Sequence, residues 1–448
     1  MRKKLIGIGA LVGLAGSLAG GLLVAGGASA APPAQLTNSD EFKLENGLQV
    51  ILMPLPSASK NALVVVFDVG NQHDPPGQSG LAHLAEHLYV TAATRATPAR
   101  TVDQYLTRYP DGWNAQTGDD YTVIAAVFTP ERTAEELAEA AHRMSGLQVT
   151  PQDLQRELPR LEVELDNMYQ RIPALAVHNH GRQQRKPLAS GGRRGGRIGQ
   201  LQGIQTHEVQ QWLDRHCKPG NATLVVAGRF DEEAVRQQIR ERFSGIEPGE
   251  PPDRATPPEW SGPGVHEVAV RPHTADPAVR VGFTFAAPDP NDPLYAAFAV
   301  QATRLIMAGQ RLAQQHPGEF PYLWRPLDDP DFFSASTTVH KGETREQAVA
   351  RLEKSLDDLL LDELRPADLL QARNLLGMFY GIADVPPATA GANPYGTAFA
   401  AGRRHRMRVD SRELKQRLEG LDSQSLRAAR RFFSPENRSV VIVRPVDD

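Results

Sequence analysis

The chain has 448 residues, of which 40% are apolar and 23% are charged, a composition typical of folded globular proteins rather than disordered or fibrous ones. This length exceeds what one hydrophobic core usually organises, so two or more domains are expected. The formal net charge of -4 at pH 7 argues against a nucleic acid or an anionic membrane as the partner.

The first thirty residues, 1–30, have the layout of a secretory signal peptide. Arg2, Lys3 and Lys4 precede an apolar, glycine-rich run that ends in Ala28-Ser29-Ala30, a small-x-small cleavage site. The run is long enough to span a bilayer, so a retained anchor is the alternative; its glycines and its A-x-A end favour cleavage. We therefore expect an exported protein, periplasmic or secreted, that has membrane contact only through this segment if it stays uncleaved.

The most informative stretch follows a strand-like run at residues 64–70. Gln78-Ser79-Gly80 is suited to start a helix, and LAHLAEHLYVTAA after it contains good helix formers and no breaker. In such a helix His83 and His87 share one face, and Glu86 lies beside His83. Two histidines at this spacing supply two of the three protein ligands of a catalytic zinc, and Glu86 is placed to act as the base. The order H-x-x-E-H inverts the commoner H-E-x-x-H.

The five-residue motif alone does not establish a metal site. About two chains per hundred of this composition contain such a string by chance, so a structural helix that happens to carry histidine is the alternative. The third ligand is sought in residues 152–171, a helix-like segment in which Glu157 and Glu164 are seven positions apart and share one face. Pro159 between them predicts either a bend or a helix that starts after Glu157.

Two later motifs are read as structural or solvent-exposed. His178 and His180 form H-x-H without a nearby acidic cluster, so an exposed, arginine-rich loop is expected rather than a metal site. GGRRGGRIG, residues 191–199, lacks the phosphate-loop spacing and is interpreted as a mobile loop. Cys217 is the only cysteine, so no intrachain disulfide forms and a packing role is expected.

Residues 247–264 hold six prolines and three glycines, which predicts an extended linker between an N-terminal domain, 36–246, and a C-terminal domain, 265–448. Each half ends with a helical stretch, the string P-x-N-x-[T/S] (219–223 and 435–439) and an apolar strand. The two strings are 216 residues apart, a period that fits a duplicated domain. Because strands and helices are interleaved in both halves, the predicted class is α+β, with two similar domains.

With these residues in place, the chain resembles the pitrilysin/insulinase family of zinc metallopeptidases, bacterial two-domain type. In that family a glutamate about 77 positions after the second histidine completes H-x-x-E-H, and another glutamate precedes it by seven; Glu164 and Glu157 occupy these places. The strings L-x-N-G-L-x-V (44–50), G-L-A-H (80–83) and N-A-x-T (114–117) also match.

The resemblance implies one Zn²⁺ per chain, with His83, His87 and Glu164 as ligands, Glu86 as general base and Glu157 as support of the ligands. Asn114 and Ala115 would offer main-chain groups to an extended substrate at a sheet edge. The resemblance also implies a clamshell of two similar α+β domains. The second half is expected to be a catalytically inactive repeat, because it contains no H-x-x-E-H.

One departure concerns how the second half holds the substrate. Family enzymes use an arginine and a tyrosine seven positions later; Tyr322 matches the tyrosine, but Gln315 stands in the place of the arginine, unless Arg311 or Arg325 substitutes. Two functions follow from the resemblance: an exported zinc endopeptidase that acts on peptides or unfolded segments, or a subunit of a hetero-oligomeric peptidase that needs a companion chain. A homodimer, or a heterodimer with an inactive homologous subunit, is the expected assembly.

Overall fold

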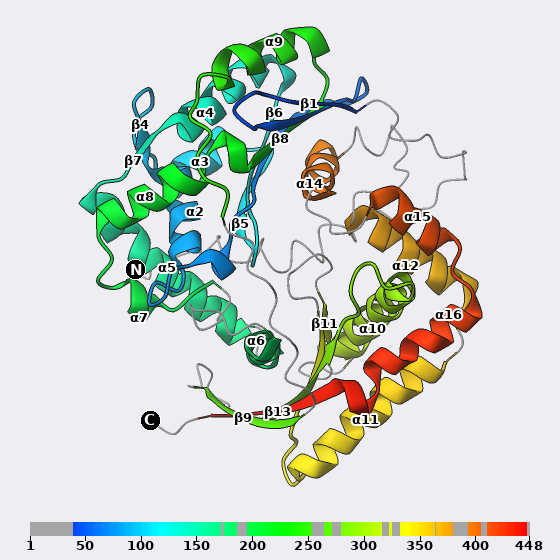
Figure 1. Ribbon diagram of the computed structural model, residues 1–448. Coiled ribbons are helices and arrows are strands. Elements are labelled where there is room, and N and C mark those ends of the chain that lie inside the picture. Colours follow the sequence, from blue (N-terminus) through cyan, green and yellow to red (C-terminus); the bar gives the residue numbers. More distant parts are fainter. Residues whose placement is uncertain are drawn as a thin grey trace, which may run out of the picture. The chain divides into compact units, whose positions relative to one another are not determined.

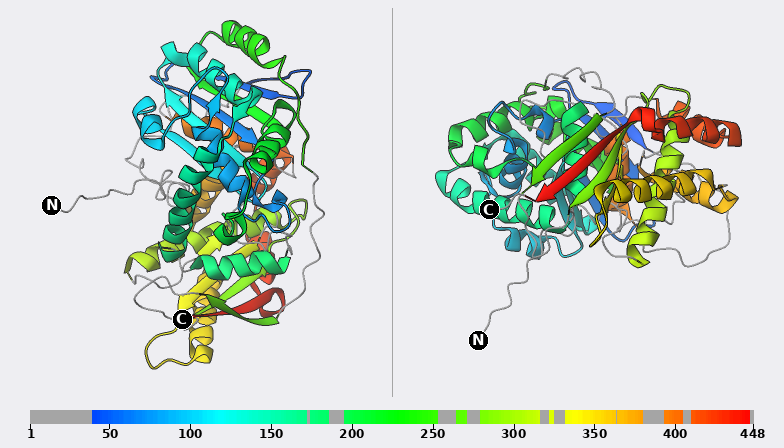
Figure 2. Two further views of the ribbon diagram at one scale, coloured as in Figure 1. Left: turned by 90° about the vertical axis from the view of Figure 1, so that its left-hand side faces the viewer. Right: turned by 90° about the horizontal axis from the view of Figure 1, so that it is seen from below.

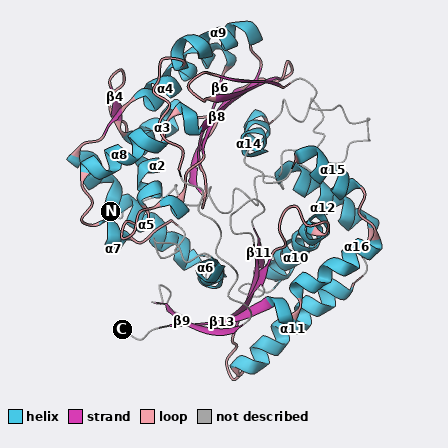
Figure 3. Ribbon diagram, in the orientation of Figure 1, coloured by secondary structure: helices cyan, strands magenta, loops and turns pink. Residues whose placement is uncertain are grey.

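The computed structural model describes residues 39–171, 174–185, 195–252, 264–270, 279–315, 322–324, 332–362, 364–379, 393–404 and 410–445. The predicted signal segment and residues 253–263 of the predicted linker lie outside these ranges. The chain forms two compact units, each combining a β-sheet with helices (Figures 1 and 3), which confirms the α+β class. Among the described helices, none is both long and apolar enough to cross a membrane.

Unit 1 takes its residues from Met1–Met168, Arg194–Arg254 and Asp384–His405. Its six-stranded sheet has the order β1-β2-β8-β3-β6-β5, in which β2 and β8 are parallel and the other neighbours antiparallel. The sequences of the central strands β3 and β8 are nearly continuous apolar runs, and both strands are buried along their whole length. The strands are β1 Asp40–Lys43, β2 Gln49–Pro54, β3 Asn61–Phe67, β5 Trp113–Thr117, β6 Thr122–Phe128 and β8 Ala222–Gly228, with a small sheet of β4 Ala93–Thr94 and β7 Leu147–Gln148.

Helices cover the sheet of unit 1. The α-helices that lie in it, or begin in it, are α2 Leu81–Thr91, α3 Val102–Arg108, α4 Thr133–Ser145, α5 Pro151–Arg171, α7 Ile198–Leu201, α8 Thr206–His216, α9 Glu232–Phe243 and α14 Pro394–Arg404. Single-turn 3-10 helices are η1 Asn71–His73, η2 Pro130–Arg132 and η3 Pro219–Asn221.

Unit 2 takes its residues from Tyr169–Arg193, Ala255–Ala383 and Arg406–Asp448. Its sheet has the order β11-β12-β10-β13-β9, and the right-hand view of Figure 2 shows β13, in red, between two green strands. The strands are β9 Gly264–Val270, β10 Arg280–Ala286, β11 Tyr322–Trp324, β12 Phe332–Thr338 and β13 Arg438–Pro445. The helices are α6 Ala174–Arg185, α10 Tyr295–Gln315, α11 Arg345–Leu361, α12 Pro366–Phe379, α15 Ser411–Glu419 and α16 Ser423–Ala428, with 3-10 helices η4 Ala429–Phe433 and η5 Pro435–Asn437.

The two sheets repeat one topology. Strands β2-β8-β3-β6-β5 of unit 1 follow the same order as β9-β13-β10-β12-β11 of unit 2, and in each the first pair is the parallel one. The repeated string P-x-N-x-[T/S] has the same role in both. The side-chain amide of Asn221 donates to the carbonyl of His216 at 3.0 Å, and that of Asn437 donates to Phe432 at 2.7 Å. Each asparagine therefore ties the end of a helix to the start of the strand that follows it.

The units exchange one helix each. Helix α6 comes from the first half of the sequence but packs on β10, β12 and β13 of unit 2. Helix α14 comes from the second half but packs on β3 and β8 of unit 1. The sequence predicted two continuous domains, 36–246 and 265–448. The observed units differ from them because α6 belongs to unit 2 and α14 belongs to unit 1. The amphipathic pattern of a helix shows that one face is buried, and does not show which sheet buries it.

Helix α2, which carries the predicted zinc motif, is fixed at both ends. Its N-cap is Gly80, whose φ of +104° favours glycine, and the carboxylate of Asp74 accepts hydrogen bonds from the backbone N–H groups of Gly80 (2.7 Å) and Ala82 (2.8 Å). At the other end, Arg143 of α4 donates to the carbonyls of Tyr89 (2.6 Å) and Ala92 (3.2 Å). An acidic group at the N-terminus and a basic group at the C-terminus also complement the helix dipole.

Exchanged helix α14 approaches its sheet closely through Gly402. A Cβ at this position would lie 2.8 Å from Cγ2 of the buried, β-branched Val66, so a larger side chain has no room. We expect Gly402→Leu to lower the free energy of unfolding by roughly 1–3 kcal/mol, although leucine favours the helix. Urea denaturation measures the effect. Ala400→Leu, on a half-exposed position of the same helix, serves as the control, and equal stability of the two variants would contradict the close packing of α14.

Candidate metal centre

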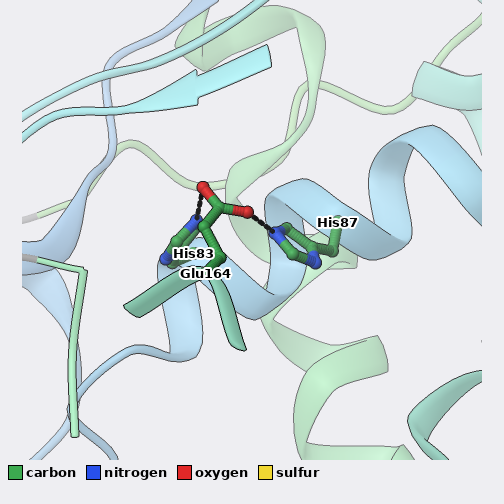
Figure 4. Close-up of side chains that lie close together, drawn as sticks. All are labelled: His83, His87 and Glu164. Atoms are coloured by element: carbon green, nitrogen blue, oxygen red, sulfur yellow. Dashed lines mark ion pairs between the residues drawn. The ribbon is translucent and has the colours of Figure 1, made fainter. Parts of the chain in front are cut away.

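Two helices bring the three predicted ligands together. His83 and His87 lie one turn apart on α2, and Glu164 lies on α5; one ligand atom from each lies within 4.8 Å of the others. The Glu164 carboxylate bridges the imidazoles, with Oε1 3.6 Å from Nε2 of His83 and Oε2 3.4 Å from Nε2 of His87 (Figure 4). Both histidines are buried and Glu164 is half-buried. In the part of the chain that the structure describes, no other group of three such side chains has this geometry.

Helix α5 runs from Pro151 to Arg171 and continues through Pro159. Glu157 therefore lies inside the helix, and the alternative that the helix starts after it is wrong. A separation of seven residues is close to two turns, so Glu157 and Glu164 share the face that meets α2. Oε2 of Glu157 lies 3.4 Å from Nδ1 of His87.

Each imidazole has its two nitrogens directed at different acceptors. Nε2 of both rings faces Glu164, whereas Nδ1 of His87 faces Glu157 and Nδ1 of His83 lies 3.2 Å from the carbonyl oxygen of Gly195. Glu157 is fully buried and is itself held by Arg156, whose Nε donates at 2.9 Å, and by Arg160. Partners of this kind orient imidazole ligands and fix which nitrogen carries the proton.

The electrostatics of the cluster favour positive charge between its donors. Burial alone would lower the pKa of His87, yet the carboxylates of Glu157 and Glu164 raise it to about 9. Burial alone would raise the pKa of Glu164, yet hydrogen bonds from both imidazoles hold it well below its usual range. Two imidazoles and one carboxylate are a donor set that fits Zn²⁺ with one position left open, and other divalent ions also accept these ligands.

Glu86, the predicted base, is held between α2 and β5. It is buried on α2 beside His87, and the hydroxyl of Thr117, the last residue of β5, donates to its Oε2. Burial raises the pKa of Glu86 above its usual range, although both histidines and the Thr117 hydroxyl act in the opposite direction. Thr117 is the last residue of the N-A-x-T string, and nothing in the string indicates this contact.

The predicted substrate strand lies at the edge of its sheet. Asn114 and Ala115 are in β5, which pairs with β6 and ends the strand order of unit 1. The side-chain amide of Asn114 donates to the hydroxyl of Tyr395 at 3.0 Å. Tyr395 is on the exchanged helix α14, and no motif in the sequence marks it. Its contact follows only from the packing of that helix on unit 1.

Tyr322 belongs to the core of unit 2. It lies in β11, is 5% exposed, packs its ring against Phe333 and has its hydroxyl 3.5 Å from Oγ of Ser355 on α11. Burial raises the pKa of Tyr322 to about 12. Of the two arginines named as substitutes, Arg311 is exposed on α10 and Arg325 lies outside the described residues.

The exposed loop predicted around His178 and His180 is wrong. Both are in helix α6, where His178 is buried, stacks on Phe332 and has Nδ1 3.0 Å from Oγ of Ser334. The glycine-rich stretch also differs from the prediction of a mobile loop, because its described part, residues 195–199, packs on the start of α2, with the Arg197 N–H donating to the Ser79 carbonyl at 3.0 Å. Both segments are rich in polar residues, so nothing in the sequence indicated that they pack against other elements.

Comparisons with known proteins point to one family. The family model "Insulinase (Peptidase family M16)" matches residues 49–188, which contain all three predicted ligands and Glu86, and the model "Peptidase M16 inactive domain" matches residues 203–376. An uncharacterized zinc protease of Rickettsia bellii is 23% identical over 216 residues, which are 48% of this chain and 52% of that protein. The chain thus spans about half the length of the first relatives it matches.

Solved structures show the same fold. A protease from Helicobacter pylori is 18% identical with a TM-score of 0.69, and the match covers 91% of this chain and 99% of that one. The periplasmic protease PqqL from Escherichia coli is 13% identical with a TM-score of 0.63, covering 93% of this chain and 48% of that one. With two family models matched in sequence order and the inverted zinc motif inside the first, the chain belongs to the insulinase family, peptidase family M16.

Proposed function

We propose that this protein is an exported zinc metalloendopeptidase that hydrolyses peptides or unfolded polypeptide segments. The observation that carries the proposal is the cluster of His83, His87 and Glu164 with the buried carboxylate of Glu86 beside it. Membership of a peptidase family supports the reaction class. The basic and apolar first thirty residues support export, as does the likeness in fold to a protease described as periplasmic.

The chain's own residues divide the chemistry between them. His83, His87 and Glu164 would hold Zn²⁺, which when bound supplies a Lewis acid for a peptide carbonyl and lowers the pKa of water. Glu86 would accept a proton from the attacking water and pass it to the leaving amine. Thr117 holds Oε2 of Glu86, so we expect Oε1 to carry the proton. Glu157 would orient the ring of His87 through Nδ1.

Substrate binding is proposed at the outer edge of β5, which ends the described sheet of unit 1. Main-chain groups of Asn114 and Ala115 would pair with an extended peptide by strand addition, a mode that reads the backbone and selects little among side chains. A folded protein rarely offers an unpaired extended segment, because its buried backbone groups are already hydrogen-bonded. Peptides and unfolded segments are therefore the expected substrates.

A second candidate function is a subunit of a hetero-oligomeric peptidase that binds peptides and needs a companion chain. The observation that favours it is the environment of Tyr322, which is buried in unit 2, together with Gln315 in the place of the family's arginine. A homodimer, or a heterodimer with an inactive homologous subunit, would then provide the missing contact with the substrate.

The role of Glu86 is tested by Glu86→Gln, which keeps the shape of the side chain and removes its basicity. We expect kcat for an unstructured peptide to fall by roughly 10²–10⁴-fold while zinc content stays unchanged. Glu162→Gln, an exposed position on α5, is the matched control. Unchanged turnover in Glu86→Gln would rule out its role as the base.

The second candidate function is tested with the wild-type chain. If this chain is inactive alone and gains activity when a companion chain is added, the second candidate is supported.

The link between α14 and the substrate strand is tested by Tyr395→Phe. This change removes the acceptor of the Asn114 amide and keeps the aromatic packing. A hydrogen bond is worth about 1 kcal/mol, so we expect KM for an extended peptide to rise about fivefold with kcat nearly unchanged. Asn114→Ala should act similarly, and the double variant should add little to either single change. Fully additive effects would show that the two side chains act separately.

A further inference from the structure

We infer that the glycine turn Gly195–Gly196 is a positioning element of the metal centre: the carbonyl of Gly195 sets the orientation and tautomer of His83, and contact between Gly196 and Gly80 sets the place of that carbonyl. The inference deepens the proposed function and rests on it. The turn belongs to the glycine-rich stretch that the proposed chemistry does not otherwise use.

The hydrogen bond between His83 and Gly195 selects one tautomer. Nδ1 of His83 lies 3.2 Å from the carbonyl oxygen of Gly195, and a carbonyl oxygen only accepts, so Nδ1 must donate. A neutral imidazole carries one N–H, which leaves the lone pair on Nε2. Nε2 is the atom that faces Glu164 at 3.6 Å. The turn therefore presents to the metal the nitrogen that already points into the cluster.

The carbonyl oxygen of Gly195 can approach His83 because two glycines, Gly196 and Gly80, are in close contact. Gly196 and Gly80 have φ angles of +103° and +104°. A Cβ on Gly196 would lie 2.2 Å from Cα and 2.6 Å from N of Gly80. Both are backbone atoms, so no change of side-chain rotamer relieves the clash. Any residue other than glycine at 196 must push the turn away from α2.

Hydrogen bonds on the N-terminal side of Gly80 tie the turn to α2. The N–H of Arg197 donates to the carbonyl of Ser79 at 3.0 Å, and the N–H of Ser79 donates to Oε1 of Gln200 at 2.9 Å. The segment after the turn is thus fixed to the residue that precedes the N-cap of α2. His83 lies in the first turn of that helix, so the Gly195 carbonyl and the imidazole keep a constant relation.

The orientation of the turn also distinguishes it from a phosphate-binding loop. Such loops direct backbone N–H groups at the anion. Here the turn directs a carbonyl oxygen at the cluster, and its partner is the N–H of an imidazole. The chemistry served by Gly195 is therefore the alignment of a cationic centre rather than the capture of an anion.

The test compares three glycine variants by zinc affinity, measured in competition with a chromophoric chelator. We expect Gly196→Ala to weaken zinc binding by roughly 10–100-fold, the usual effect of removing a partner of a metal-bound histidine. Gly342→Ala controls for backbone strain, because Gly342 has a φ of +82° and its Cβ would meet no atom within 4 Å. Gly199→Ala controls for a change in the same segment, since its Cβ also meets open space. Both controls should bind zinc as the wild type does.

A second measurement uses the wild-type chain, in case Gly196→Ala fails to fold. Nitrogen NMR of ¹⁵N-histidine-labelled, zinc-loaded protein should show His83 with a proton on Nδ1 and the metal on Nε2, and the metal on Nδ1 would overturn the inference. Zinc binding by Gly196→Ala that equals the wild type would also overturn it and leave the proposed function standing. A wild-type chain that binds no zinc would instead contradict the proposed function itself, and the inference with it.

Discussion

The candidate metal centre depends on helix α2 being held at both ends in the interior of unit 1. A buried helix leaves backbone N–H and carbonyl groups without partners at its ends, and these are costly to bury. Asp74 accepts from two N–H groups at the first turn and Arg143 donates to two carbonyls at the last, and every residue of α2 is buried between them. Other elements then dock against this fixed helix: α5 brings Glu164, β5 brings Thr117 to Glu86, and the glycine turn brings the Gly195 carbonyl to His83.

Duplication and helix exchange explain how the first half of the sequence carries the candidate metal ligands while the second half contributes a helix to the same unit. Both sheets have the same strand order, yet the second long helix, α10, contains no histidine. The second half of the sequence supplies α14, whose Tyr395 holds Asn114 on the edge strand of unit 1. A catalytic unit that consisted of the first half of the sequence alone would lack this helix and the face of the core that it covers.

Regular spacing is the reason why much of the site was predictable. Histidines four apart on a helix must share a face, and Glu157 and Glu164 share another for the same reason, so the sequence predicted the cluster of His83, His87 and Glu164 once the family's spacing was applied. The P-x-N-x-[T/S] string predicted the duplication because it repeats a local structure. The α+β class followed from strands and helices that alternate in both halves.

Contacts that depend on tertiary packing are not marked by any regular spacing in the sequence. The Gly195 carbonyl is a backbone group, which any residue would carry, and only the approach of Gly196 to Gly80 gives it a role. His178 looked exposed because its neighbours in the sequence are polar, yet α6 buries it against the sheet of unit 2. Tyr395 lies 281 positions from Asn114, and nothing in either sequence segment links them.

If His83, His87 and Glu164 form one zinc site, X-ray absorption at the zinc edge, combined with metal analysis of the purified chain, will show it. We expect about one zinc per chain, bound by two imidazole nitrogens at about 2.0–2.1 Å and by oxygen, and a loss of this metal in Glu164→Gln but not in Glu162→Gln. A folded wild-type chain without stoichiometric metal, or a Glu164→Gln variant that keeps the wild-type spectrum, would contradict it.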